Sequence, residues 1–92
     1  MRIVVCYDIV DDNKRRRLAE RLERFITRVQ KSVFEGDVDH KVLDRIRKIA
    51  NKEIDHTSDS VRIYFLCKKC MEGTEVIGCG PIISPEKDDY VV

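Results

Sequence analysis

The order of the apolar patterns along this chain restricts its fold more than any other feature. Residues 3–7 form a continuous apolar run that begins with three β-branched residues, which is typical of a central strand covered on at least one face. Two stretches with helical spacing follow, over about residues 13–26 and 40–52. Between and after them, residues 27–38 and 61–66 show strand-like patterns, the first interrupted by a tight turn near Lys31 and Ser32.

Each expected helix has one apolar side and a residue that can cap its start. The apolar positions are Leu18, Leu22, Phe25 and Ile26 in the first helix, and Val42, Leu43, Ile46, Ile49 and Ala50 in the second. Acidic residues before the first helix, Asp11 and Asp12, and Asp39 before the second supply N-cap chemistry. Gly36 indicates a bulge or a close backbone approach within its strand.

The resulting order, β-α-β-β-α-β, predicts an α+β domain with a ferredoxin-like antiparallel sheet and two helices on one face. Ninety-two residues suit one domain, which we assign to residues 1–80, with a further short strand at 74–77. Residues 81–92 then form a C-terminal tail that ends apolar, and we expect it to dock on a second subunit. A chain this short buries a modest share of its surface, which favours an oligomer.

Basic residues are concentrated in one part of the chain. Between Lys14 and Lys31 eight basic residues stand against two acids, whereas five acids and one lysine follow from Met71 onward. The net charge of +1 therefore conceals an uneven distribution. A basic stretch of this kind favours a polyanionic partner, although a solvated helix surface explains it equally well.

No apolar run approaches the roughly 18 residues needed to span a bilayer, and no basic-then-apolar signal sequence opens the chain. We therefore expect a cytoplasmic protein without a membrane partner.

The four cysteines have no assigned role at this stage. Cys67 and Cys70 have the spacing of a zinc knuckle or a redox pair, but a structural zinc site needs four ligands and the second pair is missing. Cys79 stands alone, and Cys6 lies inside an apolar strand where a core position is expected.

Asp8 is the strongest candidate for chemistry. It ends the first apolar strand, where a carboxylate is costly to bury unless it is paired, bound to metal or placed at the strand's exit. The alternative is that Asp8 caps the turn into the first helix. Mg²⁺ retains several waters and can be held by two carboxylates, and a symmetric dimer would supply Asp8 twice. A metal there could activate water and stabilise charge on a phosphoryl oxygen, as phosphodiester cleavage requires.

No other catalytic pattern competes with Asp8. His40 and His56 have no apparent nucleophile beside them, and no Gly-rich phosphate loop is present. An RNA-recognition module would need an Arg/Lys-Gly-aromatic pattern that this chain lacks.

Residues 4–9, 28–36 and 59–64 form three segments that, taken in order, resemble the family called CRISPR-associated protein two, over a match that runs from the start to about residue 66. Residues 4–9, followed by Asp11, Asp12 and a basic helix start, resemble the family's strand ending in Tyr-Asp-Ile. Residues 28–36 resemble its most distinctive stretch, and residues 59–64 are similar to the strand after its second helix. The region after residue 66, with its cysteine pair, is not part of these motifs.

The resemblance implies a ferredoxin-like homodimer in which an extra C-terminal strand is exchanged and the two Asp8 residues face each other across the interface, with Mg²⁺ or Mn²⁺ between them. It also implies metal-dependent endonuclease activity on RNA or DNA, and a complex with the larger integrase of CRISPR adaptation. By matching position, it carries over Asp8 as catalytic and metal-binding, Arg15, Arg17 and Arg28 as nucleic-acid-binding, and Tyr7 and Phe34 as supporting residues.

Two functions are compatible with these implications. The protein is a metal-dependent endonuclease that uses paired Asp8 residues, or it is a non-catalytic scaffold that binds duplex DNA, with Asp8 structural. A regulatory ferredoxin-like domain without a nucleic-acid role is a third alternative. Arginines suit phosphate contacts, but Arg15 and Arg17 are two positions apart on a helix and should diverge, and Phe34 suits a core position.

Overall fold

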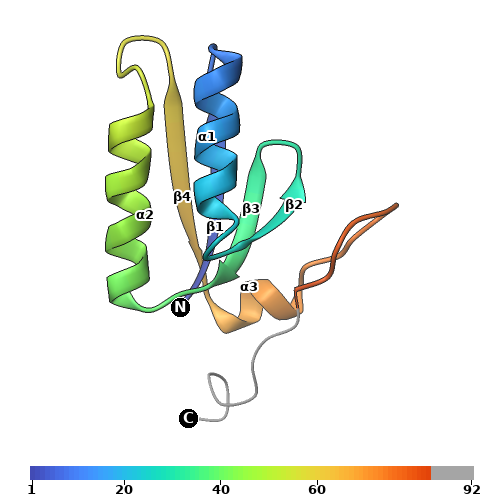
Figure 1. Ribbon diagram of the computed structural model, residues 1–92. Coiled ribbons are helices and arrows are strands. Elements are labelled where there is room, and N and C mark those ends of the chain that lie inside the picture. The colour runs from blue at the N-terminus through green and yellow to red at the C-terminus, as the bar shows by residue number, and fades with distance from the viewer. Residues whose placement is uncertain (84–92) are drawn as a thin grey trace.

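The structure is a computed structural model that describes residues 1–83. Four strands and three helices follow one another along the chain (Figure 1). They are β1 (Arg2–Asp8), α1 (Asp12–Leu22), β2 (Thr27–Gln30), β3 (Val33–Asp37), α2 (His40–Glu53), β4 (Ser60–Leu66) and α3 (Lys68–Glu72).

The strands form one antiparallel sheet in the order β2-β3-β1-β4. β1 lies in the middle because its apolar residues can be covered, while β2 and β4 occupy the edges. The two β-α-β connections bring β1 next to both β3 and β4, as a ferredoxin-like fold requires. The predicted fold class is therefore confirmed.

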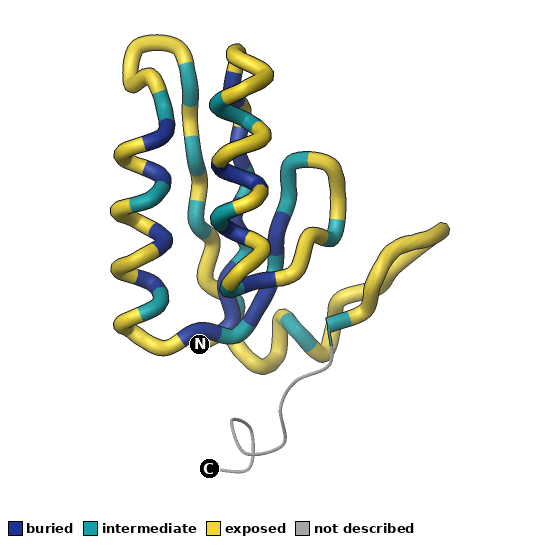
Figure 2. The backbone as a smooth tube through the Cα atoms, in the orientation of Figure 1, coloured by how far each residue is buried: buried dark blue, intermediate teal, exposed yellow. Residues whose placement is uncertain are grey.

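Helices α1 and α2 lie side by side on one face of the sheet (Figure 1). Alternate residues of β1, namely Ile3, Val5 and Tyr7, point to this face and are buried. They pack with the predicted helical positions Leu18, Leu22, Leu43 and Ile46 and with Phe34, which is fully buried. Figure 2 shows the buried positions on the inward sides of both helices. The core positions predicted for the helices and for Phe34 are confirmed.

The caps of the two long helices are the predicted ones. Asp11 accepts a hydrogen bond from the backbone N–H of Lys14, and Asp39 accepts one from Val42. α1 ends at Leu22, four residues earlier than expected, because the chain turns there toward β2. Ile26 nevertheless remains in the core, so the apolar spacing continues through the turn.

The chain after β4 differs from the sequence-based expectation. Residues 68–72 form the short helix α3, and the strand expected at 74–77 is absent, so that prediction is wrong for the described chain. Residues 74–77 have strand-like composition, but they form no strand pairing with the sheet in the part of the chain that the structure describes. Most of the tail expected at 81–92, with its exchanged strand, lies outside the described residues.

Gly36 marks a close approach, as its position in the strand indicated. A Cβ atom built at Gly36 would lie 2.6 Å from Cγ2 and 3.3 Å from Cα of Ile26, so backbone as well as side chain must move. We expect Gly36→Ala to lower the free energy of unfolding by about 1–3 kcal/mol, measured by urea denaturation. Gly73→Ala is the matched control, because its nearest neighbour would lie at 3.5 Å. Equal stability of the two variants would contradict the close approach.

Candidate functional site

Asp8 lies at the end of β1 on the sheet face that carries no helix. Because side chains alternate along a strand, Asp8 points away from the buried Tyr7 and shares its face with Cys6 and Val4. Ser60 of β4 lies opposite Asp8 in the register. The side chain of Asp8 is exposed, and its carboxylate has no hydrogen-bond or ion-pair partner within residues 1–83. This placement at the exit of a central strand is the one that the sequence predicted.

The alternative role for Asp8, capping the turn into the first helix, is not the arrangement found. Asp11 is the N-cap of α1. Asp12, the other nearby acid, forms an ion pair with Arg15. Val10, between the strand and the helix, donates its N–H to Asp59 at 3.0 Å. The neighbouring carboxylates therefore have local structural partners, and Asp8 is left available.

A divalent metal would find suitable chemistry but too few ligands in one chain. Carboxylate oxygens are the ligands that Mg²⁺ and Mn²⁺ accept. Within the described residues no three His, Cys, Asp or Glu side chains are grouped closely enough to hold a metal ion. The donor type of Asp8 fits such an ion, and a second carboxylate would have to come from another copy of the chain.

Tyr7, Phe34 and Arg28 form a cluster on the opposite, helix-covered side of the sheet. The rings of Tyr7 and Phe34 stack with centroids 6.1 Å apart, and the Arg28 guanidinium lies 5.8 Å from the Phe34 centroid. Arg28 also donates to the carbonyl oxygen of Lys31 through Nε at 3.1 Å and Nη2 at 2.6 Å. These contacts fix the β2–β3 turn. The cluster packs against the end of β1 on the helix-covered face and does not touch the open face that holds Asp8.

The hydroxyl of Tyr7 is buried and has no hydrogen-bond partner within residues 1–83. Burial raises the pKa of this hydroxyl, against the opposing influence of the positively charged Arg28 and Arg15. A buried hydroxyl without a partner costs free energy that a phenyl ring does not.

Tyr7→Phe tests this account. Near neutral pH, we expect the free energy of unfolding of the Tyr7→Phe variant to lie between that of the original protein and a value about 1 kcal/mol higher. The raised pKa means that the folded state holds the proton more tightly than the unfolded chain. The stability that depends on keeping Tyr7 protonated is therefore fully present below a pH of about 10, the pKa in the unfolded chain, and is lost as the pH rises through the higher pKa of the folded state. Urea denaturation between pH 8 and 11 should show a steeper loss with Tyr7 than with Phe. Parallel curves would contradict the account.

Arg15 and Arg17 diverge, as their spacing predicted. Arg15 donates to the carbonyl oxygen of Ile9 at 2.9 Å and pairs with Asp12, which ties the start of α1 to the end of β1. Arg17 pairs at 3.2 Å with Glu53 of α2, a nearly buried carboxylate. Arg15 and Arg17 therefore point to different partners, whereas Arg15 and Arg28 both lie close enough to Tyr7 to lower the pKa of its hydroxyl. Each of these three predicted nucleic-acid-binding arginines already has an acceptor within the chain.

Most of the basic stretch is neutralised in the same way. Arg16 pairs with Glu20 at 3.9 Å, and Arg21 reaches Glu53 at 3.4 Å. Glu53 thus receives two arginines from α1 and joins the two helices. The sequence did not reveal this contact, because it links residues more than thirty positions apart.

A second set of cations, on α2, escaped the sequence analysis. Its members are exposed, and their side chains have no ion pair or hydrogen bond within residues 1–83. We call them the α2 basic row, and they are Lys41, Arg45, Lys48 and Lys52. Their spacing of four, three and four residues places them on one side of the helix, away from buried Leu43 and Ile46. The row spans about 16 Å at about 1.5 Å per residue. The spacing of these residues can be seen in the sequence, but the absence of side-chain partners is visible only in the structure.

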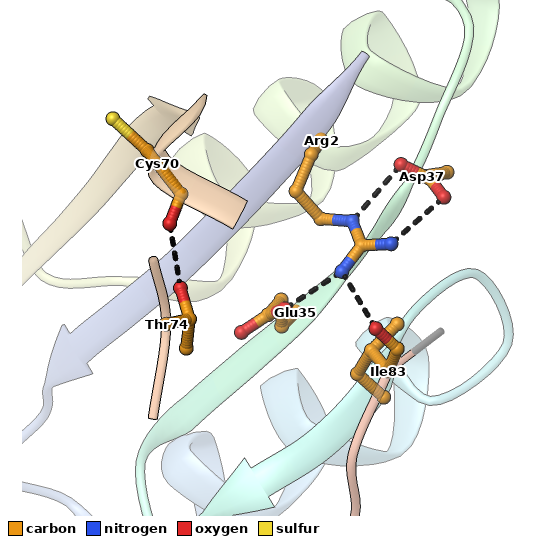
Figure 3. Close-up of polar contacts among 6 residues, drawn as sticks. All are labelled: Arg2, Glu35, Asp37, Cys70, Thr74 and Ile83. Atoms are coloured by element: carbon orange, nitrogen blue, oxygen red, sulfur yellow. Dashed lines mark hydrogen bonds and ion pairs between the residues drawn. The ribbon is translucent and has the colours of Figure 1, made fainter. Parts of the chain in front are cut away.

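Arg2 is the other residue that sequence reasoning missed. It lies on the same sheet face as Asp8, at the far end of β1, and is only 2% exposed. Its guanidinium donates to Asp37 at 2.9 and 3.0 Å, to Glu35 at 2.8 Å and to the carbonyl oxygen of Ile83 at 3.3 Å (Figure 3). Residues 68–83 close over this end of the face and leave a cavity of about 620 Å³ beside it. The Asp8 end is left open.

The fold and site define a class: a small ferredoxin-like domain with an unpaired, exposed carboxylate on its open sheet face and a row of cations without side-chain partners on a helix. Comparison with known proteins narrows the class. The family model described as CRISPR associated protein Cas2 matches residues 1–74. The chain is 38% identical over 90 residues to the CRISPR-associated endoribonuclease Cas2 1 of Chloroflexus aurantiacus, with 97% of each chain covered.

Solved structures agree. The chain is similar to Streptococcus pyogenes Cas2, with a TM-score of 0.76 and 30% identity over 85% of this chain and 100% of that one. It is also similar to a chain of a partial Cas6-RT-Cas1–Cas2 complex, with a TM-score of 0.67 and 27% identity over 91% of this chain and 98% of that one. This protein belongs to the CRISPR-associated protein Cas2 family. No helix within residues 1–83 has the length and apolar character needed to cross a membrane.

Proposed function

We propose that this protein is a homodimeric, metal-dependent endonuclease of RNA or DNA that acts in CRISPR adaptation, in the cytoplasm. The observation that carries this proposal is Asp8, an exposed carboxylate without a partner at the end of the central strand. The names of relatives support the reaction class, because the Chloroflexus protein is called an endoribonuclease.

The open face of the sheet is the surface that we expect to form the dimer interface. No helix within residues 1–83 covers the half of this face that holds Asp8. Tyr64, 47% exposed, lies there opposite Val4, and Cys6 is half-buried beside them. Arg62 lies on the same face opposite Cys6 and donates to the Tyr64 hydroxyl at 3.3 Å. A sheet face that exposes an aromatic ring beside aliphatic side chains is usually covered. A two-fold axis through it would place the same residues on both sides and bring two Asp8 carboxylates toward each other.

Two facing carboxylates would repel unless a cation or a proton lies between them. The two Asp8 side chains would hold Mg²⁺ or Mn²⁺, which supplies an activated water and stabilises charge on a phosphoryl oxygen. The remaining contribution of the chain is positional. Tyr7, stacked on Phe34 behind the strand, keeps the end of β1 in place, and Arg15 ties it to α1 through the carbonyl of Ile9.

The proposal is tested with purified full-length protein, labelled single-stranded RNA and duplex DNA. We expect cleavage with Mg²⁺ or Mn²⁺ and none with EDTA, and a particle of twice the chain mass in light scattering. A monomer at concentrations that support cleavage would contradict the paired-carboxylate site.

A second candidate function is supported by the α2 basic row. Four free cations along one side of a helix suit the phosphates of a nucleic-acid backbone, and such contacts carry affinity without sequence preference. In this alternative the protein is a non-catalytic scaffold that holds duplex DNA, with Asp8 structural. Because one similar chain belongs to a complex with Cas1, we propose a Cas1-type integrase as the partner in either case.

The salt dependence of DNA binding tests the α2 basic row. Each phosphate contact contributes about 0.9 to the slope of log K against log salt concentration. Replacement of all four members of the row by Gln should lower the magnitude of the slope by about 3.6 for each protomer that touches the duplex with its whole row. Arg16→Gln with Arg47→Gln is the control, since Glu20 and Asp44 already neutralise those arginines. An unchanged slope in the quadruple variant would show that DNA binds elsewhere.

A further inference from the structure

The pair of cysteines at the start of α3 has no place in either function proposed above. Cys67 is the N-cap residue of α3, with no side-chain capping bond, and Cys70 follows within the first turn. Their sulfur atoms lie 3.4 Å apart, and both residues are exposed. A disulfide needs about 2.05 Å between the sulfurs, so the two thiols are in non-bonded contact and must approach further for a bond to form.

The two thiols are also unequal. The pKa of the Cys67 thiol is lowered by hydrogen bonds from the backbone N–H and the thiol of Cys70. The pKa of the Cys70 thiol is raised, because its proton is shared with Cys67. A thiolate is the nucleophile in disulfide exchange, and a neighbouring thiol completes the exchange. Cys67 is therefore suited to attack first and Cys70 to resolve the product.

A metal site explains the pair less well. Structural zinc takes four ligands, and within residues 1–83 no third His, Cys, Asp or Glu joins the two cysteines in a metal-binding group. Cys79 is exposed but belongs to no such group. Two thiols with access to solvent and to each other fit a redox couple.

We propose that Cys67 and Cys70 form a reversible dithiol–disulfide couple that exchanges with small-molecule disulfides such as oxidised glutathione. The Cys67 thiolate attacks one sulfur of the small disulfide, which breaks its S–S bond, forms a mixed disulfide and releases one thiolate. The Cys70 thiol then loses its proton and attacks the Cys67 sulfur, which releases the second thiolate. The protein loses two electrons and two protons, and the small disulfide is reduced to two thiols.

The couple occupies a position from which it can affect the open face of the sheet. α3 follows β4 directly, and the Thr74 hydroxyl donates to the Cys70 carbonyl oxygen at 2.8 Å (Figure 3). From there the chain continues to Ile83, whose carbonyl accepts from Arg2 on that face. A disulfide would lock the first turn of α3, where this covering segment begins. The redox couple itself does not depend on nuclease activity or on the dimer.

The test equilibrates the reduced full-length protein with mixtures of reduced and oxidised glutathione at pH 7. Samples are quenched in acid, alkylated and analysed by peptide mass spectrometry. We expect an internal Cys67–Cys70 disulfide that forms and disappears with the ratio of the two glutathiones, while Cys79 carries a glutathione adduct. At pH 7, iodoacetamide should modify Cys67 several-fold faster than Cys79.

Cys70→Ser and Cys79→Ser complete the test. Cys70→Ser removes the resolving thiol, so Cys67 should accumulate a stable glutathione adduct, whereas Cys79→Ser should leave the couple unchanged. Two observations would overturn the proposal. One is that Cys67 in the unsubstituted protein carries only glutathione adducts and no internal disulfide. The other is one zinc ion per chain that survives gel filtration and is lost in Cys70→Ser.

Discussion

Asp8→Asn should reduce metal-dependent cleavage of nucleic acid by at least about 100-fold. The amide keeps the shape of the side chain but lacks the negative charge that holds a divalent cation. A metal at such a site contributes several kcal/mol to the stabilisation of developing charge, and about 1.4 kcal/mol corresponds to a tenfold change in rate. In a dimer the substitution removes both carboxylates at once, so the loss should be nearly complete.

The same substitution should leave the fold intact, because Asp8 is exposed and pairs with no other residue in the described chain. Asp44→Asn is the matched control, since Asp44 is an exposed acid on α2 that pairs with Arg47. The measurement is the initial cleavage rate in Mg²⁺ and Mn²⁺, together with the unfolding midpoint and DNA affinity of each variant. If the original protein cleaves and Asp8→Asn cleaves equally, Asp8 is not the metal-binding residue. If neither protein cleaves and both bind DNA, the scaffold function stands.

The elements that the sequence predicted are those whose pattern is long enough to be unambiguous. Both long helices and all four strands of the sheet follow from apolar spacing and from caps such as Asp11 and Asp39. The prediction failed after residue 66. α3 has five residues, too few to display an apolar stripe, and residues 74–77 had strand-like composition without a strand to pair with.

The site was predictable only where it depends on local sequence. Asp8 was found because a carboxylate directly after an apolar run is costly to bury unless it is paired, bound to metal or placed at the strand's exit. Charge density pointed to the arginines of α1, but binding capacity depends on which cations lack partners. Arg17 and Arg21 of α1 have a partner because Glu53 of α2 forms ion pairs with both. A row of four cations whose side chains have no partner in the described chain lies instead on α2.

The two ends of β1 on the open face illustrate opposite uses of charge. At one end Asp8 is exposed and has no partner in the described chain, as a binding residue must be. At the other end Arg2 is buried and has acceptors for its guanidinium in Glu35, Asp37 and the carbonyl of Ile83. Charge at the first end is available for a ligand, and charge at the second holds the central strands β1 and β3 together.

Arg2→Met should be the most destabilising substitution on this face. Methionine fills much of the same volume but leaves Glu35 and Asp37, which are less than 20% exposed, beside each other without their cation. Breaking a buried ion pair by removing one partner costs about 3–5 kcal/mol, because the remaining charges are left uncompensated. Urea denaturation at one fixed protein concentration and neutral pH measures the loss.

Two further variants separate the lost charge from lost packing. Arg47→Met removes an exposed arginine from its pair with Asp44 and should cost far less, since surface pairs contribute little. Arg2→Met combined with Glu35→Gln and Asp37→Asn removes all three charges and should recover a large part of the stability lost in Arg2→Met alone. If the triple variant is no more stable than Arg2→Met, the loss arises from packing around the methionine. The buried guanidinium would then stabilise the fold through its shape rather than through its charge.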